Sequence, residues 1–187
     1  AIEAVFADKA PDERAVIIER FNNKYGDLTD ALHRNLATEA YKDIKLILDP
    51  ENPDGKLPKT REIHRTWRGL GANFKGAKEL LEAMSQEERE QLKVDYQKEF
   101  GKPLEESLSH EFWGQRGPKL VRILNQGKLS LADEVYFAGH GWRLSTDGGA
   151  ICEALRNATP EEITTLRADY KERYNEDLEK VVSGWSL

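Results

Sequence analysis

The chain has 187 residues, of which 39% are hydrophobic and 33% charged, and its formal net charge is -6 at pH 7. This length and balance indicate one folded domain, or two small ones, and exclude a chain that is disordered throughout. The negative charge argues against nucleic acid as a partner, because nucleic-acid-binding surfaces need clustered Lys and Arg.

The N-terminal part of the chain has the pattern of short helices. Apolar residues recur at helical spacing, and a stretch rich in Pro, Gly and charge, residues 49–60, follows as a linker. Nothing alternates convincingly with the period of two that a half-buried strand shows. The predicted helices lie within residues 1–10, 10–25, 27–36 and 39–48.

The next predicted helices begin near Lys59 and are interrupted by a glycine-rich stretch, TWRGLGANFKG, from Thr66 to Gly76. Three glycines within these eleven residues indicate a sharp backbone turn, and an ordinary helix end followed by a turn needs glycine as much as a binding loop does. A short linker, residues 125–130, precedes the last part of the chain. Helical patterns cover residues 77–84, 85–100, 102–113, 117–126, 150–158, 159–174 and 176–185.

An internal repeat organises these helices. Segments that start at residues 10, 85 and 159 align without gaps over their first sixteen residues. Ser85 and Thr159 are predicted N-caps, each answered three residues later by a glutamate, whereas Ala10 gives the first copy a weaker start. Each of these helices is expected to end at a residue that tolerates left-handed backbone, namely Gly26, Gly101 or Asn175.

An apolar stripe steps by four residues along one face of each repeated helix. We expect its members to pack in the core. They are Ile17, Phe21 and Tyr25 in the first copy, Leu92, Tyr96 and Phe100 in the second, and Leu166, Tyr170 and Tyr174 in the third. The sequence therefore predicts an all-α chain of repeated units of about 75 residues, each with four or five short helices.

The repeated unit resembles the annexin repeat, a module of five helices. TPEEITTLRADYKERYNEDLEKVVSG, residues 159–184, is the closest match, and SQEEREQLKVDYQKEFGKPLEESLSHEF, residues 85–112, comes next. The resemblance implies a right-handed superhelical bundle of such repeats. It divides the chain into a partial repeat over residues 1–50 (helices two to five), a complete one over 59–126 and a partial one over 130–187 (helices one to four). The alternative is that all three form one compact domain.

The resemblance also implies calcium-dependent binding to an anionic phospholipid surface. In annexins a G-x-G loop after the first helix of a repeat supplies main-chain carbonyl oxygens to Ca2+, and an acidic residue on the fourth helix supplies a carboxylate. By this resemblance the metal ligands are the carbonyls of Trp67, Gly69 and Gly71 and the carboxylate of Glu111, which lies 40 residues after Gly71. The chemistry is suitable, because Ca2+ takes six to eight oxygen ligands and glycines let successive carbonyls turn towards one point.

Departures from the family pattern limit the prediction to one intact site. The residue after the second glycine, a Thr in the family, is Ala72. In the third unit the loop of residues 139–149 lacks a clean G-x-G, and Trp185 stands where the acid would be. In the first unit that position falls near Asn35. Membrane binding by this chain alone should therefore be weak, since several sites acting together bind more tightly than one.

Two side chains are candidate membrane contacts. Leu70 lies between the glycines at the tip of the loop, and Trp142 lies in the longer third loop, although an aromatic residue there can also serve packing between units. The side chain of Trp67 is expected to pack inward. No apolar run approaches the roughly 18 residues of a membrane span, so we expect a cytoplasmic protein that is peripheral at the membrane when calcium is bound.

Other features do not support catalysis. The stretch GANFKGAK only faintly resembles a phosphate-binding loop, because its lysine does not follow the second glycine. Cys152, the single cysteine, excludes an internal disulfide and is predicted to be a small buried residue in a helix. No pair of carboxylates flanks an obvious cleft, so we predict no enzyme. The alternative function is a calcium-independent helical module that binds a protein partner or serves a structural role in a larger protein.

Overall fold

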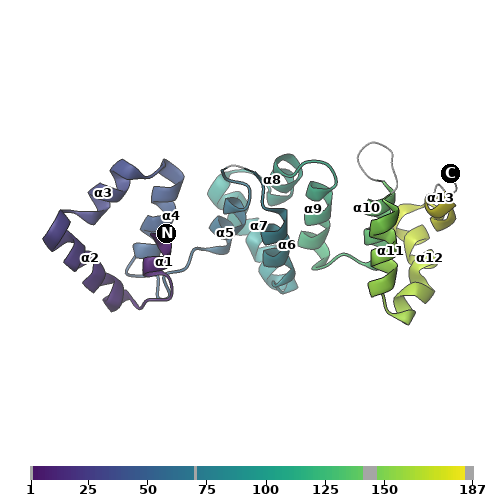
Figure 1. Ribbon diagram of the computed structural model, residues 1–187, viewed down its shortest axis with the longest axis horizontal. Coiled ribbons are helices and arrows are strands. Elements are labelled where there is room, and N and C mark those ends of the chain that lie inside the picture. The colour runs from purple at the N-terminus through teal and green to yellow at the C-terminus, as the bar shows by residue number, and fades with distance from the viewer. Residues whose placement is uncertain (1, 70, 141–146, 184–187) are drawn as a thin grey trace. The chain divides into compact units, whose positions relative to one another are not determined.

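The computed structural model describes residues 2–69, 71–140 and 147–183, and every regular element within these ranges is an α-helix (Figure 1). The predicted all-α fold of short helices is therefore confirmed. The chain divides into two compact units, the N-terminal unit of residues 1–62 and the C-terminal unit of residues 63–187. Within the described residues, no helix is long and apolar enough to cross a membrane.

The N-terminal unit is built from four helices and the start of a fifth. α1 packs on α4, and α3 contacts both α2 and α4. Apolar side chains from these helices and from Leu57 form its core, so the segment after α4 also contributes to packing. The helices are α1 (Glu3–Phe6), α2 (Pro11–Tyr25), α3 (Leu28–Asn35), α4 (Thr38–Leu48) and α5 (Lys59–Arg65), which continues into the C-terminal unit.

The C-terminal unit contains two hydrophobic cores. α6 and α8 pack on α9 around the first core, and α10 packs on α11 and α12 around the second. The helices are α6 (Phe74–Glu82), α7 (Gln86–Phe100), α8 (Leu104–Glu111), α9 (Arg116–Gln126), α10 (Leu131–Gly139), α11 (Gly148–Asn157), α12 (Pro160–Tyr174) and α13 (Leu178–Ser183).

Capping fixes the ends of the three repeated helices as the sequence predicts. The hydroxyl of Ser85 accepts a hydrogen bond from the N–H of Glu88 at 3.2 Å, and the carboxylate of Glu88 accepts one from the N–H of Ser85 at 2.7 Å. Thr159 and Glu162 form the same reciprocal pair. Such a cap stabilises a helix by about 1 kcal/mol. The C-terminal residues Gly26, Gly101 and Asn175 all have positive φ, at 87°, 74° and 52°.

Two buried arginines, which the sequence analysis did not single out, hold the first two repeated helices in place. Arg89 on α7 is 6% exposed and donates hydrogen bonds to the carbonyl of Leu124 at 3.0 Å and to that of Met84 at 2.5 Å. Arg14, at the equivalent position of α2, is 1% exposed and donates to the carbonyls of Lys9, Asp49 and Asn52. Each arginine thereby satisfies main-chain oxygens at the end of a neighbouring helix, which otherwise lack partners.

Two expectations about burial are wrong. Tyr25 was expected in the core but is 66% exposed. Its equivalent in the second repeat, Phe100, is covered by the stacked ring of His64 on α5 at 4.3 Å, and no described ring covers Tyr25 in this way within the N-terminal unit. Cys152 is exposed rather than buried. The buried face of α11 carries Ile151 and Ala154, and a residue one position after Ile151 is turned away from that face.

Candidate functional site

The glycine-rich loop between α5 and α6 is closed at its base by one main-chain hydrogen bond. The N–H of Asn73 donates to the carbonyl of Thr66 at 2.6 Å, and the Asn73 side chain caps α6 by accepting from the N–H of Gly76 at 3.0 Å. Within the loop, Gly69 and Gly71 have φ of 108° and 87°. An added Cβ at either glycine would meet nothing within 4 Å, so glycine is needed there for its backbone conformation and not for space.

Trp67 stands at the start of this loop with its side chain packed inward, as predicted. It is 9% exposed, and its ring contacts those of His64, Tyr96 and Phe112. The indole therefore belongs to the core. If Trp67 binds a cation, it does so with its main-chain carbonyl.

Phe112 connects the two sequence-distant parts of the predicted site. It follows Glu111 directly, at the end of α8, and is 1% exposed. Its ring centroid lies 5.9 Å from that of Trp67 at the start of the loop and 6.4 Å from that of Phe74 just after it. Because one buried ring packs against both sides of the loop, the C-terminal end of α8 is held beside it.

Glu111 has a carboxylate that could serve as a ligand to a cation at this position. Its side chain is 34% exposed, and one of its carboxylate oxygens lies 3.6 Å from Nδ1 of His110. Burial raises the pKa of the neighbouring Tyr96, and the negative charge of Glu111 raises it further. Glu111 is thus close enough to affect a residue that itself packs on Trp67.

The donor set fits a hard cation only if the main chain takes part. Among the described residues, no three or more His, Cys, Asp or Glu side chains gather in a way that could hold a metal ion. The loop with its two glycines of positive φ supplies carbonyl oxygens, and Glu111 supplies a carboxylate. This oxygen-only set is the chemistry that Ca2+ prefers and differs from a zinc site, which needs His or Cys.

Comparisons with known proteins found similarity to annexins. No protein-family model matches the chain. Annexin A13 of Homo sapiens is 28% identical over 124 residues, which cover 66% of this chain and 39% of that protein. Annexin A8 of Mus musculus is 28% identical over 133 residues (71% and 39%), and annexin A5 of Rattus norvegicus is 28% identical over 122 residues (65% and 38%). The chain is similar in sequence to annexins over about two thirds of its length.

The chain spans about two fifths of the length of the curated proteins that it matches. Solved structures of annexins are also similar to it. A point mutant of annexin A8 matches with 21% sequence identity and a TM-score of 0.40, covering 100% of this chain and 61% of that one. Chicken annexin V matches with 19% identity and a TM-score of 0.42, covering 96% and 59%.

The other two annexin-like units lack parts of the site. In the third, the N–H of Asp147 donates to the carbonyl of Ala138 at 2.8 Å and its carboxylate caps α11, which repeats the closure made by Asn73. Trp142 and Trp185 lie outside the described residues, as does Leu70 in the second unit. In the first unit Asn35 ends α3 where Glu111 ends α8, and its side-chain amide donates to the carbonyl of Ala31.

A residue next to the candidate site was missed by sequence reasoning. Trp113, two residues after Glu111, is 80% exposed, the largest value among the exposed large hydrophobic side chains of the described chain. It lines a cavity of about 530 Å³ together with Phe74, Arg116, Lys119 and Phe137. The sequence did contain a signal. Leu104, Leu108 and Phe112 step by four into the core, so the adjacent Trp113 had to point elsewhere.

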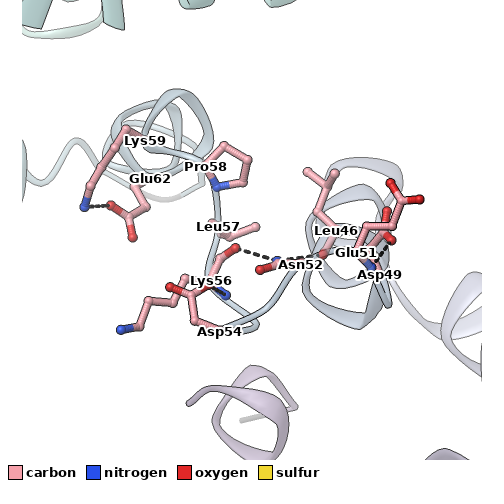
Figure 2. A pocket seen from close by; sticks show the side chains of 10 residues that line it. All are labelled: Leu46, Asp49, Glu51, Asn52, Asp54, Lys56, Leu57, Pro58, Lys59 and Glu62. Carbon is pink, nitrogen blue, oxygen red and sulfur yellow. Dashed lines mark hydrogen bonds and ion pairs between the residues drawn. The ribbon is translucent and has the colours of Figure 1, made fainter. Parts of the chain in front are cut away.

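A second cavity, in the N-terminal unit, is lined by the segment between α4 and α5 and offers no comparable site. In Figure 2 Asp49 and Glu51 lie together, and Asp54 and Glu62 lie apart from them. Lys59 pairs with Glu62 at 2.6 Å. Asn52 uses its amide to tie the segment together, donating to the carbonyls of Leu46 and Lys56 at 2.9 and 2.8 Å. These polar groups stabilise the connection between two repeats.

Proposed function

We propose that this annexin relative binds Ca2+ at the loop between α5 and α6 and, through the ion, an anionic phospholipid surface. The proposed ligands are the main-chain carbonyls of Trp67, Gly69 and Gly71 and the carboxylate of Glu111. Even with both carboxylate oxygens engaged, these residues supply fewer than the six to eight oxygens that Ca2+ takes. The remaining positions would be filled by water and by a lipid phosphate.

The observation that carries this proposal is the packing of Phe112. Its contacts with Trp67 and Phe74 place the end of α8 beside the loop, although Glu111 lies 40 residues after Gly71 in the chain. A partly exposed carboxylate at a helix end that packs beside a loop with two glycines is a suitable place for a hard cation.

A bound Ca2+ would reduce the charge repulsion between the chain and the anionic membrane. A chain of net charge -6 is repelled by an anionic membrane, and a bound divalent cation supplies positive charge between them. Since one candidate site is present in the described residues, and Ala72 replaces the family's Thr beside it, we expect weak binding with a high calcium requirement.

Co-sedimentation with phosphatidylserine-containing vesicles tests the proposal. The wild type should pellet with millimolar calcium and stay in the supernatant with chelator. Glu111→Gln should lose most of the pelleted fraction, because a neutral amide replaces an anionic carboxylate that can bind Ca2+ through both oxygens. Glu106→Gln is the matched control, since it removes the same charge from the same helix at an exposed position.

Two outcomes would contradict the proposal. If the wild type stays in the supernatant with calcium, the chain alone does not bind such membranes. If it pellets equally with chelator, the ion is not the bridge, which would favour the calcium-independent interaction module. Equal losses in Glu111→Gln and Glu106→Gln would remove the special role of Glu111.

A further inference from the structure

The loop between α8 and α9 presents a tryptophan to solvent immediately beside the proposed calcium ligand. Trp113 is 80% exposed, whereas Trp67, on the other side of Phe112, is 9% exposed. Single exposed leucines are common on protein surfaces, but tryptophan is usually well buried. An indole left this exposed is available for a partner.

The position of Trp113 is fixed by its neighbours. Phe112 is anchored in the core between Trp67 and Phe74, so the next residue is turned outward from a rigid point. Gly114 follows with a φ of 64° and lets the chain turn into α9. The tryptophan is therefore part of the same surface as the calcium loop, because Phe74 packs beside that loop and also lines the cavity next to Trp113.

Basic side chains accompany the tryptophan. Arg116 is exposed in the first turn of α9, and Lys119 lies one turn later along the same cavity. The ammonium of Lys119 lies 5.7 Å from the ring centroid of Phe137, and it forms no ion pair with a carboxylate of the described residues. Burial lowers the pKa of Lys119, and the negative charges of Glu134 and Asp147 raise it in part. A lipid phosphate at this cavity would add to that compensation.

We infer that Trp113 is an interfacial anchor whose indole enters the headgroup region of the anionic lipid surface, with Arg116 and Lys119 facing lipid phosphates. This inference rests on the proposed function. Tryptophan favours the membrane–water interface, because its ring is apolar and its N–H is polar. The basic pair complements anionic headgroups and not a cationic partner.

Vesicle binding at the calcium concentration that gives half-maximal binding of the wild type tests the anchor. Trp113→Ala should weaken binding about tenfold, because the interfacial contact of the indole is lost. Tyr25→Ala is the matched control, since it removes an aromatic side chain that is 66% exposed in the N-terminal unit. Its binding should equal that of the wild type. Equal binding by Trp113→Ala and the wild type would overturn the inference and leave the calcium proposal intact.

Fluorescence quenching reports directly whether the indole of Trp113 enters the lipid. Vesicles that contain brominated lipid should quench part of the tryptophan emission of the wild type in the presence of calcium. Trp113→Phe, which keeps an aromatic ring and should keep most of the binding, should lose that quenched part. Unchanged quenching in Trp113→Phe would place another tryptophan at the lipid and overturn the inference. If the wild type does not bind vesicles at all, both the inference and the proposed function fail.

The role of Arg116 can be tested against a second basic residue near the same helix. Arg116→Gln should weaken binding and reduce its sensitivity to salt, because it removes a contact with anionic headgroups. Lys128→Gln removes the same charge just beyond the opposite end of α9 and should have little effect. Equal effects of the two substitutions would indicate general charge attraction and would overturn the assigned role of Arg116.

Discussion

Glycine at position 71 is required by the backbone alone. Its φ is 87°, and an added Cβ would touch nothing within 4 Å. Substitution by alanine should therefore cost only the strain of a left-handed conformation, about 1–2 kcal/mol. In the free protein the loop could relieve that strain by changing its conformation, and such a change would turn the carbonyl of Gly71 away from the proposed ion.

Gly71→Ala should accordingly lose calcium-dependent vesicle binding to a greater degree than it loses stability. Gly101→Ala is a matched control, because Gly101 has a φ of 74° with open space around it but lies at the end of α7. Both variants should lower the melting temperature by a few degrees, and only Gly71→Ala should impair binding. Equal binding by the two variants would indicate that the loop carbonyls are not ligands.

At the scale of helices, buried polar side chains join elements that the apolar stripe alone would leave loosely oriented. Arg89 connects α7 with the carbonyl of Met84 before it and with that of Leu124 at the end of α9. The equivalent residue in the third repeat is Ile163, which is 49% exposed, so that repeat lacks the connection. The α12 segment is joined to its neighbours through another buried group, Asp133.

Asp133 lies at the start of α10, is fully buried and is surrounded by donors from α9, from α12 and from the N-cap residue of α10. The N–H of Ser130 donates to it at 2.9 Å and the hydroxyl of Tyr174 at 2.5 Å, and Gln126 donates as well. Arg122 and Arg173 lie 3.6 and 3.7 Å away. Burial opposes ionisation, but the hydrogen bonds from Tyr174, Ser130 and Gln126 outweigh it and hold the pKa of Asp133 below its ordinary value.

The stabilisation from Asp133 should therefore depend on pH. A lowered pKa means that the ionised carboxylate stabilises the fold above the ordinary value of 3.8 and that this contribution is lost as pH falls through the folded-state pKa. We expect Asp133→Asn to be less stable than the wild type by about 2–4 kcal/mol at pH 7, because buried donors lose an anionic acceptor.

Urea unfolding of both proteins at pH 7 and near pH 3 measures the effect. The difference between wild type and Asp133→Asn should shrink at the lower pH, since the unfolded wild type takes up a proton at this carboxyl below its ordinary pKa of 3.8 and is thereby favoured over the folded state. Asp95→Asn, at an exposed position of α7, serves as the control and should cost little at pH 7. A difference that is the same at both pH values would contradict the assigned role of the charge.

At the scale of the whole molecule, the sequence predicted what is decided locally. The caps at Ser85 and Thr159, the positive φ at Gly101 and the buried stripe through Tyr96 depend on nearby residues, and the structure confirms them. Exposure depends on which distant element covers a face, and here the predictions were less successful. Tyr25 and Cys152 are exposed because no described element packs over them as expected.

At the candidate site, too, features that depend on nearby residues were predictable, and features that depend on distant elements were not. Its residues came from a resemblance, and spacing alone could not show that Glu111 and the glycine loop lie together. Phe112 supplies that connection, and its burial was foreseeable because it continues the four-residue steps of Leu104 and Leu108. Arg14 and Arg89 were also foreseeable, since they occupy the same position of two aligned repeats. Their role was not, because it depends on carbonyls 35 residues or more away.

The proposed function predicts how many calcium ions one chain binds, because the repeats differ in which candidate ligands they keep. The second repeat has both glycines and Glu111, whereas the first has Asn35 in place of the acid and the third has Trp185. Isothermal titration without lipid should therefore give one calcium ion per chain, with no cooperativity, and Glu111→Gln should abolish the heat of binding.

Hydrogen exchange can locate that ion within the molecule. Binding to the folded state alone protects the groups that order around the ligand. Added calcium should slow exchange at the loop between α5 and α6 and at the end of α8, and should leave the N-terminal unit unchanged. Protection in both units, or a titration that gives two or more ions per chain, would contradict a single site and would require ligands other than Glu111.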